Sequence, residues 1–156
     1  MFQRALRAIK ADPEVFELVE HDDGYTGEAG IIVAITSVLA AFGVLFGGAG
    51  FLGFVGTIIA GLIGWFVWAG LTFVIGARLF GGTADYGEML RVTGFAHAPH
   101  VLSIIPFAQF LTLLWSLWVA IVAIRQGLDL TTGKAIAVAL LGWLVMAILR
   151  SIFFFV

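Results

Sequence analysis

Long stretches without charge dominate the chain. Residues 29–77 contain no Asp, Glu, Lys or Arg, and neither do residues 92–124. A helix rises about 1.5 Å per residue and the hydrocarbon core of a bilayer is about 30 Å thick, so one crossing takes roughly 20 residues. The first stretch is therefore long enough for two crossings, whereas a soluble helix would carry charges on its wet face. The pattern predicts an all-α, polytopic membrane protein.

Small residues and proline divide these stretches. The run Gly47-Gly48-Ala49-Gly50 indicates a tight turn, because small residues allow the backbone to reverse. Pro106 divides the second stretch, since proline interrupts a helix. With the polar connections between the stretches, these breaks predict a bundle of five transmembrane helices. The expected spans are about 31–46, 51–79, 88–105, 107–124 and 135–156.

Residues 1–28 are more polar and precede the first span. Apolar residues recur at helical spacing between Phe2 and Ile9 among basic residues, which suits a short amphipathic helix lying in the membrane interface. The Asp-Pro pair at 12–13 predicts the start of a second helix, with Asp as the N-cap. We therefore expect a short N-terminal interfacial helical head, followed by a transmembrane domain over residues 29–156.

Basic residues predict the orientation, because segments rich in Lys and Arg stay in the cytoplasm. In a five-span arrangement, only Arg150 lies at the outer end. The other seven basic residues fall on the inner side: Arg4, Arg7, Lys10, Arg78, Arg91, Arg125 and Lys134. The N-terminus is expected in the cytoplasm and the C-terminus outside.

Composition narrows the function classes. The 156 residues are 62% hydrophobic and 12% charged, against about 45–50% and about 25% in soluble domains. The net charge of −2 argues against a nucleic-acid partner. The sequence has no cysteine, which excludes thiolate metal sites and a cysteine nucleophile. Neither Ser37 nor Ser103 has an evident His–carboxylate partnership, so we expect no enzyme and no cofactor.

The expected third span is the one rich in polar groups, and intramembrane polar groups favour a functional hypothesis. His97 and His100 are three residues apart, so a helix would place them on one face. They could relay protons, or they could bind a metal if further ligands were present. The favoured interpretation is that they hydrogen-bond backbone groups freed by Pro99, or Gln109 on the next helix, and no metal is expected. The candidate polar site comprises Thr93, His97, His100, Ser103 and Gln109.

Two further sets of residues have expected structural roles. Small residues let membrane helices approach closely, and Gly56, Ala60 and Gly64 form such a ladder. Charged residues at the expected cytoplasmic ends of the spans should serve mainly as ordinary interface anchors. One arrangement of this kind is an ion-paired plate that fixes helix ends and binds anionic lipid headgroups or the head helix. The charged residues are Arg78, Asp85, Glu88, Arg91, Arg125, Asp129 and Lys134.

Residues 91–100, Arg-Val-Thr-Gly-Phe-Ala-His-Ala-Pro-His, carry a resemblance to a known family. Gly94, Phe95 and Pro99 resemble the Gly-aromatic-xxx-Pro signature of the Yip family, membrane proteins named for their interaction with Ypt/Rab GTPases. The Asp-Pro-Glu-Val-Phe run at 12–16 is similar to the opening of bacterial members. The Trp, Arg and Lys-Ala positions between Trp115 and residue 135 resemble the family's last two spans.

The resemblance implies a five-helix bundle with a cytosolic N-terminus, and in eukaryotes a role in vesicle traffic. The compact form is similar to prokaryotic members, so a prokaryotic plasma (inner) membrane is expected. The head is short and lacks the acidic-Leu-Tyr-Gly-Pro motif, which puts GTPase binding in doubt. We expect a scaffold or adaptor that works through membrane lipids and a membrane-protein partner or a second copy. The alternative is a small transporter, channel or lipid-moving protein that uses the polar third span.

Overall fold

The computed structural model describes the backbone of residues 1–104 and 109–154, and the side chains of residues 1–102, 110–149 and 151–152. All regular structure in these residues is helical, which confirms the all-α class. The order is α1 (Phe2–Ile9), α2 (Pro13–Glu20), η1 (Asp23–Tyr25), α3 (Thr26–Val44), η2 (Leu45–Ala49), α4 (Gly50–Phe80), α5 (Tyr86–Ala96), η3 (Ala98–Ile104), α6 (Gln109–Gly127) and α7 (Thr132–Phe154).

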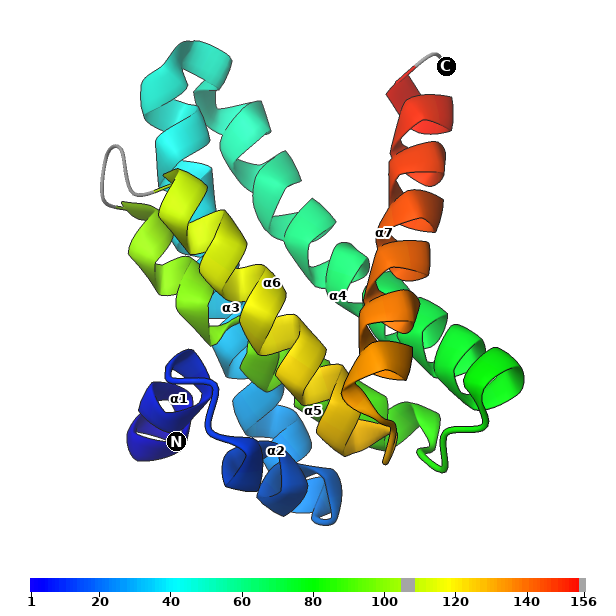
Figure 1. Cartoon of the computed structure of the whole chain (residues 1–156). Helices are drawn as coiled ribbons and strands as arrows, with labels where there is room; N and C mark the ends of the chain where they lie inside the picture. Colours follow the sequence, from blue (N-terminus) through cyan, green and yellow to red (C-terminus); the bar gives the residue numbers. More distant parts are fainter. Residues whose placement is uncertain (105–108, 155–156) are drawn as a thin grey trace.

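The turn between α3 and α4 lies where the sequence predicts it. The segment η2 joins two helices across a kink, where Gly48 has φ 93° and Gly50 has φ 66°. Glycine has no Cβ and therefore adopts such left-handed angles without steric cost. The chain reverses here, and the two long helices run back along each other (Figure 1).

The expected span over 88–105 is not a continuous α-helix. The helix α5 ends at Ala96, and η3 continues the chain as a 3₁₀-helix that contains Pro99. Proline has no N–H to donate and disfavours the α conformation in the residue before it, which explains the break. At the start of α5, Asp85 and Glu88 form a reciprocal capping box. Asp85 Oδ1 accepts a hydrogen bond from the Glu88 N–H at 2.8 Å, and Glu88 Oε2 accepts one from the Asp85 N–H at 2.6 Å.

Three stretches of the described residues are long and apolar enough to cross a membrane: Asp23–Phe80, Phe110–Gly127 and Thr132–Leu149. The first contains both α3 and α4. The shorter α5 and η3 are not among them. Length and apolarity thus support a multi-pass chain, while the count of five crossings remains a proposal.

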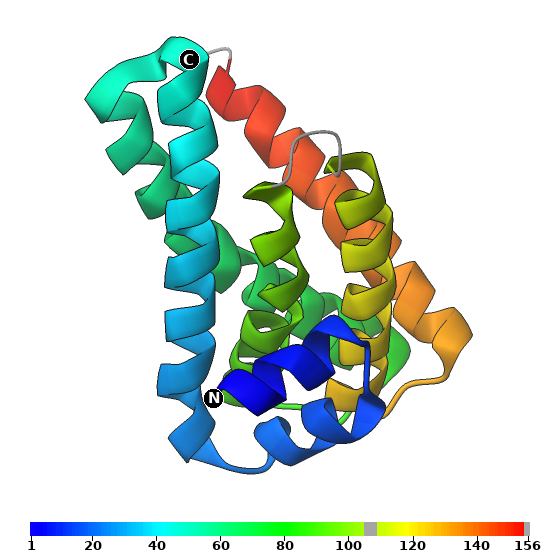
Figure 2. The same cartoon turned by 90° about the vertical axis from the view of Figure 1, so that its left-hand side faces the viewer.

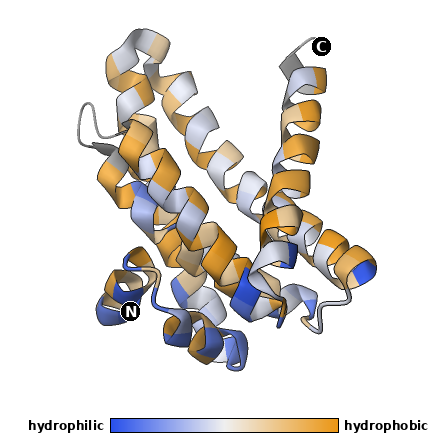
Figure 3. Cartoon of the chain, viewed as in Figure 1, coloured by the Kyte–Doolittle hydropathy of each residue, from blue (hydrophilic) through white to orange (hydrophobic). Residues whose placement is uncertain are grey.

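Connections gather at two ends of the bundle (Figures 1 and 2). The η2 turn and the C-terminal end of α7 lie at one end, and α1, α2 and the α4–α5 and α6–α7 connections lie at the other. Hydrophilic residues concentrate at this second end (Figure 3). The helices between the two ends are predominantly hydrophobic.

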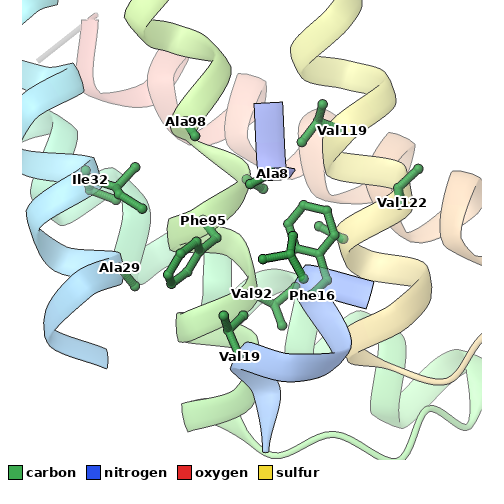
Figure 4. Packing of buried hydrophobic residues seen from close by; sticks show 14 of the residues in the cluster. Ala8, Phe16, Val19, Ala29, Ile32, Val92, Phe95, Ala98, Val119 and Val122 are labelled. Carbon is green, nitrogen blue, oxygen red and sulfur yellow. The ribbon is translucent and has the colours of Figure 1, made fainter. Parts of the chain in front are cut away.

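The core joins the head to the bundle. Phe16 and Val19 of α2 are fully buried together with Val92 and Phe95 of α5, and Val119 of α6 completes this cluster (Figure 4). Full burial of such side chains stabilises by about 1.5–3 kcal/mol each. The head therefore packs against α5 and α6 as part of the same hydrophobic core.

The close helix contacts differ from those expected. A Cβ added at Gly56 or Gly64 would meet no atom within 4 Å, so these residues do not bring helices of this chain together. The tight contact of α4 with α3 is at Gly61, directly against Ser37. Ala60 and Gly64 instead face a cavity. A helix can present more than one row of small residues, and packing decides which row is covered.

Candidate functional site

A cavity of about 730 Å³ lies between α4, α5, α6 and α7. Its walls are mainly apolar and include the indoles of Trp65, Trp68 and Trp143. Trp65 is held in place because its Nε1 donates to the carbonyl of Leu90 at 3.0 Å. Ligand sites in proteins combine this size with apolar walls and a few polar groups.

The polar groups of this cavity come from α5, η3 and α6. Thr93, His97 and His100 line it, so the structure brings together these three predicted site residues. Thr93 Oγ1 donates to the carbonyl of Met89 at 2.6 Å, and His97 Nδ1 lies 2.8 Å from the carbonyl of Thr93. A carbonyl only accepts, so Nδ1 carries the proton in this contact. The rings of His97 and His100 are 5.6 Å apart.

Ser116 is the cavity residue that sequence reasoning missed. Its Oγ is buried and has no hydrogen-bond partner among the residues that the structure describes. A buried hydroxyl without a partner costs free energy, so such an atom marks a place where a ligand or water would be stabilised. In the sequence it is a single hydroxyl in the apolar helix α6, with no signal of its own. The side chains of the predicted residues Ser103 and Gln109 lie outside the described part.

Arg91 forms the main polar connection between the bundle and the head. It is only 5% exposed. Its Nε donates to the carbonyl of Val19 at 3.0 Å, one Nη to the carbonyl of Glu20, and the other Nη to Asp23 Oδ1 at 2.5 Å. Carbonyls at a helix C-terminus lack intrahelical partners and attract cations. Arg91 therefore caps α2 from the interior of the bundle.

Other contacts fix the remainder of the head. Arg4 makes two hydrogen bonds to the carboxylate of Glu28, at 3.0 and 2.5 Å. The Trp115 indole of α6 donates to the carbonyl of Ile9 at 2.6 Å. Both ends of α1 are thus bonded to the bundle.

The expected ion-paired plate is wrong in its pairing. In the described residues, none of the seven predicted charges pairs with another, and Arg91 pairs with Asp23 of the head. Lys134 Nζ donates to the Phe80 carbonyl at 3.0 Å, and Asp129 accepts from Thr83 Oγ1 at 2.6 Å. Lys134 and Asp129 thus bond to a backbone carbonyl and a hydroxyl, and not to opposite charges.

Comparison with known proteins decides the family. A family model described as the Yip1 domain matches residues 13–153. The chain belongs to the Yip family. Membership and the long apolar stretches make this Yip protein a multi-pass membrane protein. Yip proteins are generally non-enzymatic membrane proteins. Comparison with curated proteins and with solved structures gives no match.

The family signature has a structural role in this Yip protein. A Cβ at Gly94 would lie 2.6 Å from the Cβ of Ala29 and 3.0 Å from the Trp65 ring, so only glycine allows α5 to approach α3 this closely. Phe95 is fully buried in the core. Pro99 lies in η3, beyond the end of α5. The signature thus sets the position of the helix that carries Arg91, Thr93 and His97.

Proposed function

We propose that this Yip protein is a non-enzymatic membrane scaffold or adaptor that works through protein and lipid partners. The main support for this proposal is the Arg91 cap, which connects the head to α5, the helix that carries Gly94 and Phe95 of the family signature. A partner that binds the head is thereby coupled mechanically to the bundle. GTPase binding is not part of the proposal, because the head lacks the motif associated with it.

The head leaves apolar side chains for a partner or a lipid surface. Phe2 is 73% exposed, and Leu6 and Leu18 are also exposed. Exposed apolar residues on a charged helical surface are typical of interaction sites and interfacial helices. The proposed partners are membrane lipids and a membrane protein, which could be a second copy of this chain.

The matching experiment is purification in mild detergent, followed by native mass spectrometry of what remains bound. A stoichiometric protein or lipid should accompany the wild type and be lost from a Phe2→Asp, Leu18→Asp double variant. Glu14→Gln, at an exposed position of α2, is the control and should retain it. A wild-type monomer that carries neither protein nor lipid would refute the adaptor function.

We further propose five crossings in a prokaryotic plasma membrane, with the N-terminus in the cytoplasm and the C-terminus outside. The basic residues support this orientation. Because the chain has no cysteine, single substitutions Ala49→Cys and Thr131→Cys give unique labelling sites in the two opposite connections. A membrane-impermeant maleimide should reach position 49 from outside and position 131 only from the cytoplasmic face. Labelling of both from one face would exclude the topology.

The cavity favours a second candidate function, that of a small transporter, channel or lipid-moving protein. Its polar atoms lie at His97, His100 and Ser116, and its walls are apolar. This combination suits a neutral amphiphile, with hydrocarbon against the indoles and one oxygen near the imidazoles.

Two leucine substitutions on α4 test the cavity. Gly64 lines it and has open space at its Cβ, so Gly64→Leu should fill it. Gly56 has equally open space on the same helix but does not line the cavity, so Gly56→Leu is the matched control. Co-purifying lipid, or lipid flux in liposomes, should fall only in Gly64→Leu and in a His97→Ala, His100→Ala double variant. Equal lipid content and flux in all variants would rule out use of the cavity.

A further inference from the structure

Two carboxylates and an imidazole gather at the C-terminal end of α2. Glu17 precedes Glu20 by three residues and His21 by four, so helical geometry places each of these two side chains next to that of Glu17. One potential ligand atom from each lies within 4.8 Å of those from the other two. Nothing in the adaptor function requires this arrangement.

Glu20 is the unusual member. It is 5% exposed, and its Oε2 is buried without a hydrogen-bond partner in the described part of the chain. Arg91 donates to the carbonyl oxygen of Glu20, not to its carboxylate. A buried carboxylate without a partner is costly and favours either a proton or a cation. Its Oε1 lies 3.3 Å from His21 Nδ1.

The surroundings are electronegative. Burial, together with the negative charge of Glu17, raises the pKa of Glu20 to about 7, and Asp129 and Glu88 add to the rise. His21 acts in the opposite direction. The carboxylate therefore sits in a field that would attract a positive ion.

We propose that Glu17, Glu20 and His21 form a binding site for a divalent transition-metal cation of the zinc type. One imidazole with two carboxylates is a ligand set that suits zinc, whereas calcium prefers six to eight oxygens. Ligand atoms about 2.1 Å from a tetrahedral zinc are about 3.4 Å apart. The distance between His21 Nδ1 and Glu20 Oε1, 3.3 Å, is close to this ligand–ligand separation.

The third ligand needs only a side-chain adjustment. Glu17 is exposed, and its Oε2 accepts from Gln126 Nε2 of α6 at 3.2 Å. Such a bond to a ligand carboxylate orients it. His21 Nδ1 now donates to the carbonyl of Glu17 at 2.9 Å, so the imidazole would turn away from this carbonyl and lose its Nδ1 proton to water before it binds the metal. Water would complete the fourth position, and the ion would neutralise Glu20 and tie α2 to α6.

The test is a calorimetric titration of the whole chain, stripped with a chelator and held in mild detergent, with zinc chloride. One zinc ion per chain should bind, and Glu20→Gln and His21→Ala should each weaken binding by at least about tenfold. Glu14→Gln lies on the same helix away from the cluster and should bind as the wild type does.

Three results would overturn the site: no saturable zinc binding, undiminished binding in His21→Ala, or calcium binding as tight as zinc binding. The His21 side chain is 68% exposed, so its truncation leaves the core intact and remains informative if Glu20→Gln fails to fold. The retained helical circular-dichroism signal checks this. Undiminished binding in His21→Ala would place the zinc elsewhere, for example at the intramembrane imidazoles. None of these results bears on whether a partner binds the head.

Discussion

The Arg91 cap leads to the most discriminating prediction about the head. Arg91→Ala removes two charged hydrogen bonds to the carbonyls of Val19 and Glu20, and the third bond to Asp23. Hydrogen bonds that involve a charged group contribute about 1.5–3 kcal/mol each. Asp23 is 96% exposed, so its bond contributes little, about 0–1 kcal/mol. We expect head docking to weaken by about 3–7 kcal/mol in total.

Hydrogen–deuterium exchange measures this loss segment by segment. Since 1.4 kcal/mol is a factor of ten, protection of the α2 amides should fall by about two to five orders of magnitude, up to the limit set by global unfolding. Amides of α7, which packs mainly against α4 and α6, provide an internal reference for the intact bundle. Arg91→Lys keeps the charge but not the planar fork, and should be intermediate.

Arg78→Ala is the matched control. Arg78 is exposed near the C-terminal end of α4 and makes no hydrogen bond to the head in the described part of the chain, so its removal should leave α2 protected. Wild-type exchange rates over α2 in Arg91→Ala would refute the cap. Equal loss of protection in α2 and α7 would show global unfolding and contradict a local role.

Three further predictions concern packing, protonation and capping. Gly94→Ala should destabilise the bundle by about 1–3 kcal/mol and lower its melting temperature in detergent. Gly27→Ala is the control, because a Cβ at Gly27 meets no atom within 4 Å, and it should leave the melting temperature unchanged. Equal melting temperatures of the two variants would contradict the close approach of α5 to α3. The raised pKa of Glu20 means that the docked head binds this proton more tightly than the unfolded chain. With zinc chelated, head protection should therefore be greatest below the usual value of 4.5 and be lost as the pH rises to about 7. Glu20→Gln should remove this dependence, and a flat wild-type profile would refute it. Asp85→Ala should destabilise the start of α5 by about 1 kcal/mol and speed amide exchange there about fivefold, because the capping box is lost. Asp85→Asn should destabilise it less, and unchanged exchange in Asp85→Ala would exclude the cap.

Local chemistry made part of the fold predictable. The glycine turn at 47–50 and the Asp-Pro start of α2 follow from the conformations that these residues allow, and both are confirmed. The sequence predicts one span over 88–105, but the backbone changes to a 3₁₀-helix near Pro99. Spacing also predicted that His97 and His100 would lie close together.

Other features depend on contacts between distant segments. The sequence placed Arg91 at the mouth of a span, but its partners Val19, Glu20 and Asp23 lie about 70 positions earlier in the chain. Ser116 is a candidate ligand-binding residue because the orientation of α6 in the bundle places it in the wall of the cavity.

By itself, the sequence determined that this chain is helical, resides in a membrane and carries the Yip signature. These properties follow from runs of neighbouring residues, because the free energy of transfer into lipid adds along a segment and is independent of helix order. The tertiary structure decided which faces meet. Side-chain packing between helices sets the rotation of each helix about its axis. This packing places Gly61 against Ser37, leaves Gly64 open to a cavity and directs Arg91 to the end of α2.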